Sequence, residues 1–448
     1  MKIERKVLNR VEGEIELKLL WKSGRVDDAF LCAMDYRGFE RLLKGKPFLD
    51  ALVIVPRVCG ICGHAHLMAC VKAIEDAYSS EGYPVQLSDK ALEIRKLTLM
   101  CEMLQNHLRW FYMYLLPDIV KLEPSIAELY EPLRGRAWVE ALRASNMPIK
   151  VIALFGGQWP HTSYAVPGGV VCDPTGYELS QAELFLERLK TFFESWLLGM
   201  PLEEYLSLKG RNYLKDIRGD LGRFTEVAIE HNLHEEGRSY DRFITGGELK
   251  PLFRSGFFTR EGVSPFDADK VSENDEFTFF RRNGSAYTWS KAARYSGLPC
   301  ETGPLARQLV SGNRVIGSLF RRFGSSVLVR VVARMDEAVR LFTEAQRTLH
   351  RIKLDEPSWN RPSVDEKVFS GRGVGVVEAA RGTLIHELEI EGGRIRSYNI
   401  ITPTVWNLGP RDAEHLGVAE RALLGLDSEL KAEIVVRSFD VCSVCTTH

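Results

Sequence analysis

"RVCGICGHAH", residues 57–66, contains two cysteines, Cys59 and Cys62, at Cys-x-x-Cys spacing, and residues 440–448, "DVCSVCTTH", repeat that spacing near the other end of the sequence. A Cys-x-x-Cys turn points two sulfurs at one metal ion, so two such turns can supply four thiolates. Three kinds of site are compatible with this pattern. Zinc is the commonest metal on four cysteines, a redox-active dithiol needs only the first pair, and thiolates also favour nickel or iron. Zinc ribbons draw their ligands from one compact unit, which these distant pairs do not form.

The composition is that of a globular protein. The 448 residues are 45% apolar and 27% charged, with a net charge of -1. This length allows a large core, or about two to three domain-sized units. A near-zero net charge indicates neither a nucleic-acid nor an anionic-membrane partner.

Targeting and membrane segments are not evident. The longest apolar runs, such as residues 51–56, are far shorter than the ~18 residues of a membrane-spanning helix. The first residues, "MKIERKVLNRVEGE", lack the apolar core of a secretory signal. We therefore expect a cytoplasmic protein, with export beside a signal-bearing partner as the alternative.

The nine cysteines do not form a disulfide scaffold, because an odd count with four in closely spaced pairs fits reduced thiols. The single cysteines stand among apolar or small residues and are predicted to be small buried hydrophobes. They are Cys32, Cys70, Cys101, Cys172 and Cys300.

Hydrophobic periodicity predicts long helices in the middle of the chain. The clearest follows Cys62, and another begins at a Ser88 cap and is expected to end at Pro117. Further helices are expected at residues 178–200, 303–322, 325–353 and 412–424.

Short β units are expected near the chain ends. Alternation around Ser23-Gly24 predicts an N-terminal β-hairpin, Gly392-Gly393 marks a second hairpin, and residues 432–439 are predicted to be extended. The fold class is therefore mainly α with small β units (α+β): a central long-helix bundle with peripheral β segments. We expect one domain, 1–448, divided into a β-rich segment 1–56, helical core 57–200, irregular α+β 201–300, helical core 301–365, and β segments with the C-terminal tail 366–448.

The residues that flank the cysteines favour one kind of site. Residues 57–62 match the motif Arg-x-Cys-Gly-x-Cys, and residues 440–448 match Asp-Pro-Cys-x-x-Cys-x-x-His, with Val441 in place of the proline. With these and further stretches in the same order, the chain resembles the large subunit of [NiFe]-hydrogenases from end to end. The further stretches are "NRVEG" (9–13), "RGFE" (37–40), "GGQWPH" (156–161), "GPLAR" (303–307), "EAARG" (378–382) and "PTVWNLGPRD" (403–412).

The resemblance implies that both cysteine pairs converge on one nickel–iron centre. Cys59 and Cys442 would be terminal nickel ligands, and Cys62 and Cys445 would bridge nickel and iron. The iron of this family carries cyanide and carbon monoxide, which implies dedicated maturation proteins. Precursors in the family often lose a tail after the terminal His, here His448, to an endopeptidase.

The implied reaction is H₂ ⇌ 2 H⁺ + 2 e⁻ by heterolytic cleavage, which requires a proton acceptor at the centre. By resemblance Cys445 takes the first proton and Glu12 the next, since a carboxylate in a partly dry site has a raised pKa. Arg381 would lie over the open face of the metals with its fixed fork of donors, paired with Asp440. Asn106 stands where the family often has an aspartate.

A second, smaller metal site is implied for Glu40 and His448, usually with magnesium, which oxygen ligands suit. The alternative is a hydrogen-bonded pair that holds the C-terminal segment in place.

Electrons must leave through a partner, because the remaining cysteines are too few and too scattered for iron–sulfur clusters. The resemblance implies a small subunit that carries those clusters, in a heterodimer or higher oligomer, with H₂ as substrate. Two related proteins of other function are the alternatives. A regulatory H₂ sensor would keep the same centre with low turnover, whereas the homologous subunit of respiratory complex I lacks the cysteine pairs.

Overall fold

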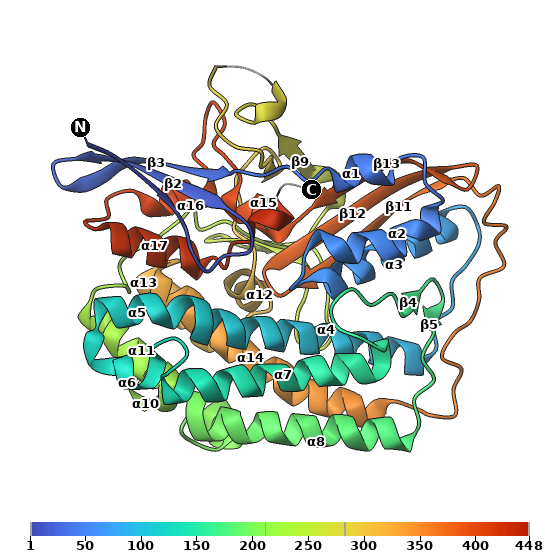
Figure 1. Ribbon diagram of the computed structural model, residues 1–448, viewed down its shortest axis with the longest axis horizontal. Coiled ribbons are helices and arrows are strands. Elements are labelled where there is room, and N and C mark those ends of the chain that lie inside the picture. Colours follow the sequence, from blue (N-terminus) through green and yellow to red (C-terminus); the bar gives the residue numbers. More distant parts are fainter. Residues whose placement is uncertain (1, 211, 282–283, 447–448) are drawn as a thin grey trace.

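The computed structural model describes residues 2–210, 212–281 and 284–446. Long helices form a layer in the lower half of Figure 1, and sheets and short helices, with both ends of the chain, lie above this layer. The long helices are α4 (Asp89–Arg109), α7 (Arg136–Gly156), α8 (Gly176–Phe192) and α14 (Val327–Arg351). The expected fold class, mainly α with small β units, is confirmed. One main core of buried apolar residues extends from Leu8 to Val441.

The helix that begins after Ser88 is longer than predicted. The Ser88 side chain accepts a hydrogen bond from the backbone of Ala91, as expected of a cap. However, the helix continues through a π-helical segment, η3 (Trp110–Leu115), into α5 (Leu116–Leu122). Pro117 was wrongly predicted to end it. Proline is tolerated in the first turn of a helix, and Pro117 occupies the first turn of α5.

Two antiparallel sheets contain the longest strands. The first consists of β1 (Lys2–Val7), β2 (Ile15–Lys22) and β3 (Arg25–Ala33), and the second of β11 (Gly371–Ala379), β12 (Gly382–Glu391) and β13 (Arg394–Ile401). The predicted hairpin turns at residues 23–24 and 392–393 are both present.

Strand β11 lies directly on helix α3 (Gly63–Ser80). A Cβ atom at Gly373 or Gly375 would come within 1.9 Å of a backbone oxygen of α3, from Ala73 or Ala69 respectively. Glycine is therefore required where the two backbones meet. This contact brings the start of α3 close to the end of β11, and both ends carry residues of the site described below.

Near the C-terminal end, one prediction was wrong and one predicted helix is shorter than expected. Residues 432–439 were expected to be extended, but most of them lie in helix α17 (Glu429–Ser438), which the Ser428 side chain caps. The β-branched run favours a strand locally, and burial against the neighbouring helices overrides it. The helix expected at 412–424 is shorter, α16 (Val418–Leu423).

The region expected to be irregular α+β, 201–300, contains short elements. The helix expected at 303–322 is divided at Gly312 into α12 (Pro304–Val310) and α13 (Arg314–Phe323). The remaining helices are α1 (Phe39–Leu43), α2 (Ala51–Ile54), α6 (Ala127–Tyr130), α9 (Leu202–Ser207), α10 (Tyr213–Asp216), α11 (Gly219–Glu230) and α15 (Pro403–Leu408). The remaining strands are β4 (Ala165–Val166), β5 (Gly169–Val170), β6 (Phe243–Thr245), β7 (Gly256–Thr259), β8 (Gly262–Ser264), β9 (Val271–Asn274) and β10 (Ala292–Tyr295).

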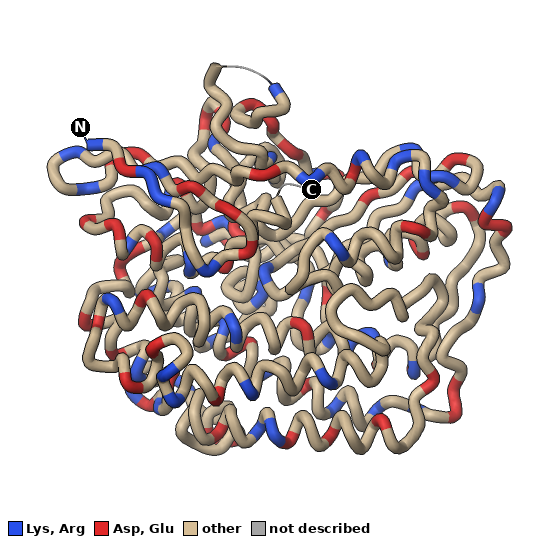
Figure 2. Tube along the Cα trace, in the orientation of Figure 1, with Lys and Arg blue, Asp and Glu red and all other residues tan. Residues whose placement is uncertain are grey.

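Acidic and basic residues are interspersed along the trace (Figure 2). Among the described residues, no helix is both long and apolar enough to span a bilayer. Of the single cysteines, Cys70, Cys101 and Cys300 are buried as expected. Cys32 and Cys172 are only half-buried. Cys32 lies on the more exposed face of β3.

Candidate metal centre

Four cysteine thiols from the two ends of the sequence meet in the interior. Cys59 Sγ lies 3.8 Å from Cys442 Sγ, Cys62 Sγ lies 3.5 Å from Cys445 Sγ, and Cys442 Sγ lies 3.0 Å from Cys445 Sγ. All four side chains are buried, and none forms a disulfide. The fold therefore brings together the four cysteines that the sequence suggested as one ligand set.

The first pair lies on the turn between η2 (Val55–Val58) and α3. Two backbone N–H groups of this turn donate to Cys59 Sγ at 3.4 Å, including that of Cys62. Gly63 begins α3, and a Cβ there would lie 2.3 Å from the carbonyl oxygen of Pro56. The turn is thus too tight for any other residue at this position.

Helix α4 supports the same turn through Glu102, which sequence reasoning missed. Its buried carboxylate accepts hydrogen bonds from the backbone N–H groups of His64 (2.9 Å) and Ala65 (3.0 Å). A carboxylate here satisfies N–H groups that have no partner within the helix. Burial raises the pKa of Glu102 to about 8.

The second pair is held by the N-terminal segment and by α15. The backbone N–H of Ser443 donates to the carbonyl of Glu12 at 2.8 Å, and the Thr402 hydroxyl donates to the carbonyl of Cys445 at 2.6 Å. Glu12 and Cys442 also form a parallel β-bridge. Two segments from opposite ends of the sequence therefore support each other around the thiols.

Gly13 makes this contact possible, and Gly13→Ala is expected to weaken it. Gly13 has φ +79°, and a Cβ there would lie 2.9 Å from Val444 Cγ1. The substitution costs about 1–2 kcal/mol for the left-handed backbone and also displaces the cysteine segment. Calorimetry and metal analysis of the purified variant should show lower stability and less bound metal per chain.

The matched control for this substitution is Gly24→Ala. Gly24 has a similar φ of +76°, but nothing lies within 4 Å of the Cβ position. This variant should lose only the backbone contribution to stability and keep its metal. Equal metal content in the Gly13→Ala and Gly24→Ala variants would contradict the proposed contact.

The electrostatics of the four thiols fit a metal ion. Hydrogen bonds from Cys442, Cys445 and Cys62 hold the pKa of Cys59 well below its ordinary value. Burial raises the pKa of Cys442 well above its ordinary value. Several buried thiolates cannot coexist without a compensating cation, and a thiophilic metal ion replaces their protons on binding. The donor set of four sulfurs therefore fits nickel, iron or zinc.

Arg381, Asp440 and Asn106 form a polar group beside the thiols. Arg381 Nε donates to the carbonyl of Asp440 at 2.9 Å, and its guanidinium lies 3.2 Å from the Asp440 carboxylate. With its amide nitrogen toward Asp440, Asn106 donates to that carboxylate at 2.9 Å and accepts from Arg381 Nη2 at 3.1 Å. A neutral amide thus connects the anion to the cation. The predicted pairing of Arg381 with Asp440 is present.

A second arginine, Arg334 on α14, also binds Asp440 and was missed from the sequence. Its Nη1 donates to the Asp440 carboxylate at 2.9 Å and contacts His107 Nδ1 at 3.2 Å. Asp440 adopts a left-handed backbone, φ +56°, which is uncommon for a residue other than glycine. These two arginines hold it in that conformation.

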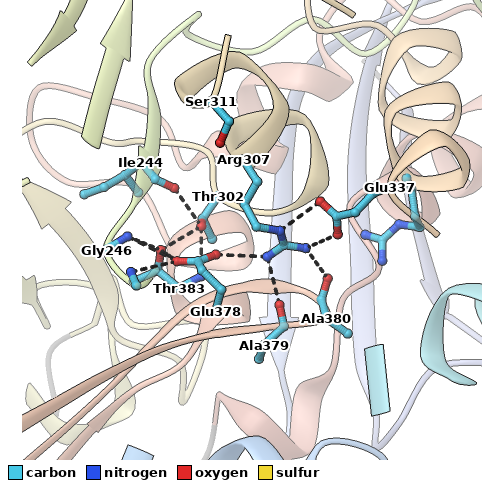
Figure 3. A network of polar contacts seen from close by, with 12 residues as sticks. Ile244, Gly246, Thr302, Arg307, Ser311, Glu337, Glu378, Ala379, Ala380 and Thr383 are labelled. Atoms are coloured by element: carbon cyan, nitrogen blue, oxygen red, sulfur yellow. Dashed lines mark hydrogen bonds and ion pairs between the residues drawn. The ribbon is translucent and has the colours of Figure 1, made fainter. Parts of the chain in front are cut away.

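The segment that carries Arg381 is anchored by a buried network around Arg307 (Figure 3). Arg307 forms ion pairs with Glu337 (2.6 Å) and Glu378 (2.9 Å), and it donates to the carbonyls of Ala379 and Ala380. Burial opposes ionisation of Glu337, but the Arg307 charge outweighs it and lowers its pKa to about 2. Breaking such a buried pair is costly, so the network fixes the backbone directly before Arg381. The only signal in the sequence was a charged residue within the apolar stretch "GPLAR".

Glu12 lies at the edge of the thiol cluster. The Tyr114 hydroxyl donates to Glu12 Oε1 at 3.4 Å. Burial raises the pKa of Glu12, and the negative charge of Cys59 adds to this effect, while Arg381 opposes it. Glu12 thus lies close enough to Cys59 to feel its charge, and its role as a proton acceptor stays a prediction.

Glu40 lies apart from the thiols. Glu40 Oε1 accepts the backbone N–H of Ile400 at 2.9 Å, and Lys291 Nζ lies 3.8 Å from Glu40 Oε2. His448, its predicted partner, lies outside the described residues. The pairing of these two residues stays a prediction.

The chain buries four reduced thiols from its two ends beside a buried arginine–carboxylate pair. These are the features of a metalloprotein with thiolate ligands. Comparison with known proteins identifies the class: the family model for nickel-dependent hydrogenases matches residues 37–127 and 133–448, and the chain belongs to this family. The predicted resemblance, and with it the prediction of a hydrogenase large subunit, is confirmed.

Individual relatives span the whole chain. It is 27% identical to the periplasmic [NiFeSe] hydrogenase large subunit of Desulfomicrobium baculatum, over 100% of this chain and 95% of that protein. It is 28% identical to the coenzyme F420 hydrogenase subunit alpha of Methanocaldococcus jannaschii, over 100% and 94%. The reduced Ni-Fe-Se hydrogenase structure from D. vulgaris Hildenborough superposes with a TM-score of 0.84 and 25% identity, over 100% of both chains.

Proposed function

We propose that this chain is the catalytic large subunit of a [NiFe]-hydrogenase that carries out H₂ ⇌ 2 H⁺ + 2 e⁻. The observation that carries the proposal is the group of four buried thiols, which matches the family's metal chemistry. Cys59 and Cys442 would be terminal nickel ligands, and Cys62 and Cys445 would bridge nickel and iron. When bound, a nickel–iron centre with cyanide and carbon monoxide on the iron supplies heterolytic cleavage of H₂.

The protein's own residues would then manage the proton and the charge. Cys445 Sγ accepts the first proton, and the Glu12 carboxyl accepts it next, because burial has raised the Glu12 pKa. Arg381, paired with Asp440, places a fixed positive charge beside the sulfurs. Its Nη1 is buried and has no hydrogen-bond partner among the described residues, so it can donate to a ligand of the centre.

A magnesium ion at Glu40, with His448 as second ligand, is part of the proposal. A carboxylate oxygen suits magnesium, and the Glu40 carboxylate would supply Oε2 as that ligand. Lys291, 3.8 Å away, would have to share this oxygen or turn aside. A plain hydrogen-bonded pair remains the alternative.

The partners follow from the same proposal. An iron–sulfur small subunit would receive the electrons, as the name "large subunit" of the D. baculatum relative supports. Maturation proteins would deliver the diatomic ligands, and an endopeptidase would act on a precursor tail. That relative is periplasmic, and a cytoplasmic location for this chain stays a prediction.

Metal analysis together with infrared spectroscopy tests the proposal. The purified protein should contain nickel and iron, with one carbonyl and two cyanide stretching bands in a region where protein groups do not absorb. Zinc in place of nickel and iron, with no such bands, would contradict it and indicate a structural site. If the bands are present, the rate of H₂-dependent dye reduction separates an enzyme from a low-turnover H₂ sensor.

A further inference from the structure

The structure points to a role for Tyr114 that the family motifs do not include. We propose that Tyr114 is a positioning residue whose hydroxyl holds the Glu12 carboxyl beside the thiol cluster, where it can receive a proton. The inference rests on the proposed role of Glu12. It concerns a side chain of this sequence that is not itself a metal ligand.

The position of Tyr114 supports this role in two ways. Its hydroxyl donates to Glu12 Oε1, and its ring packs against the buried cluster that contains Cys59 and Cys445. In the described part of the chain, no other side chain is hydrogen-bonded to the Glu12 carboxyl. Tyr114 therefore contacts the proposed proton acceptor and packs against the cluster that contains the proposed donor, Cys445.

The local helix geometry places the Tyr114 side chain there. Tyr114 lies in the π-helical segment η3, Trp110–Leu115, between α4 and α5. A π-helical turn inserts an extra residue and rotates the following side chains, and such turns are frequent at functional sites. At the start of the same segment, Trp110 Nε1 donates to the carbonyl of Arg437 at 2.8 Å, which fixes η3 against α17.

The backbone of the Glu12 segment is tied to the same helix. Arg10 and Arg437 both form ion pairs with Asp118 on α5, and Arg437 Nη1 donates to the Arg10 carbonyl at 2.7 Å. Arg10 Nε also donates to the carbonyl of Tyr114 at 3.5 Å. With the backbone held in this way, the orientation of the Glu12 side chain depends on its own contacts.

The Tyr114 hydroxyl is suited to donate a hydrogen bond at all physiological pH values. A tyrosine hydroxyl has an ordinary pKa of about 10. The phenol therefore keeps its proton at physiological pH and donates to the carboxylate form of Glu12. That form is the one that must be positioned before it accepts a proton.

The test is Tyr114→Phe in the assembled holoenzyme, which removes the hydroxyl and leaves the ring in place. H/D exchange between H₂ and D₂O should fall about tenfold to a hundredfold. This is the change in rate expected if the free energy of one hydrogen bond to a charged group is lost from the transition state. Nickel content should not change. In a Glu12→Gln background the same substitution should have no further effect, because Tyr114 acts through Glu12.

Tyr112→Phe is the matched control. Tyr112 lies in the same π-helical segment and donates to a different carboxylate, Asp220, at 2.7 Å. Its loss should leave exchange unchanged. Wild-type exchange in Tyr114→Phe, or an equal fall in the Glu12→Gln background, would overturn the inference.

A second measurement does not depend on activity. The infrared C=O band of the protonated Glu12 carboxyl, identified by its absence in Glu12→Gln, should shift to higher wavenumber in Tyr114→Phe because one hydrogen bond is lost. An unchanged band would overturn the inference. Failure of the proposed proton route looks different, since Glu12→Gln itself would then exchange at the wild-type rate.

Discussion

Cys62→Ser and Cys445→Ser should each abolish H₂-dependent dye reduction. Their sulfurs lie 3.5 Å apart in the buried cluster, and both are proposed to bridge nickel and iron. A serine hydroxyl is a harder donor than a thiolate and does not ionise at neutral pH, so it cannot replace a bridging sulfur. Activity should fall to background, and metal analysis should show less than one nickel per chain.

Cys172→Ser provides the matched control. Cys172 is half-buried and lies outside the thiol cluster, so the same change of sulfur to oxygen should leave both activity and nickel content intact. Full activity in either bridging variant would contradict the assignment of that cysteine. Loss of activity in the Cys172 variant would mean that the assay reports general damage to the fold.

Glu12→Gln should lower H/D exchange by about 100-fold to 10,000-fold, the range over which a positioned acid–base group contributes to rate. Glutamine has the same shape and can still accept the hydrogen bond from Tyr114, but it cannot carry the proton. Because the backbone contact of residue 12 with Ser443 is kept, nickel and iron content should not change. Mass spectrometry of HD formation measures the exchange directly.

Glu14→Gln is the control for that experiment. Glu14 is exposed, and only its backbone carbonyl contacts the C-terminal segment, through the Ser443 hydroxyl. Exchange in this variant should equal that of the wild type. If Glu12→Gln also exchanged at the wild-type rate, protons would leave the site by another route.

Local patterns in the sequence were sufficient for much of the fold. The 3.6-residue periodicity identified the helix after Ser88, and glycine pairs or Ser-Gly located both hairpins, because these features depend on residues close in sequence. The prediction that Pro117 ends the helix failed because proline is compatible with the first turn of a helix. Here the α-helix changes to a π-helical segment and then continues as α5. Residues 432–439 misled because their β-branched residues are stabilised as a helix by tertiary packing.

The site was only partly predictable for a related reason. The Cys-x-x-Cys spacing identified the four cysteines as candidate metal ligands, and the flanking motifs identified Glu12, Arg381 and Asp440. Glu102, Arg334 and Tyr114 have no such signature, because each acts on a partner far away in sequence. Such pairs become visible only when the fold brings the two segments together.

The separation of the thiol pairs has a consequence for biosynthesis. Cys59 and Cys442 are 383 positions apart, so a ribosome that adds about 5–20 residues per second makes the second pair on the order of 20–80 seconds after the first. During that interval Cys59 and Cys62 lack the second pair of sulfurs, so their thiols are accessible to oxidants and to other thiophilic metal ions such as zinc. The four-sulfur site can therefore be completed only after the end of the sequence has been synthesised.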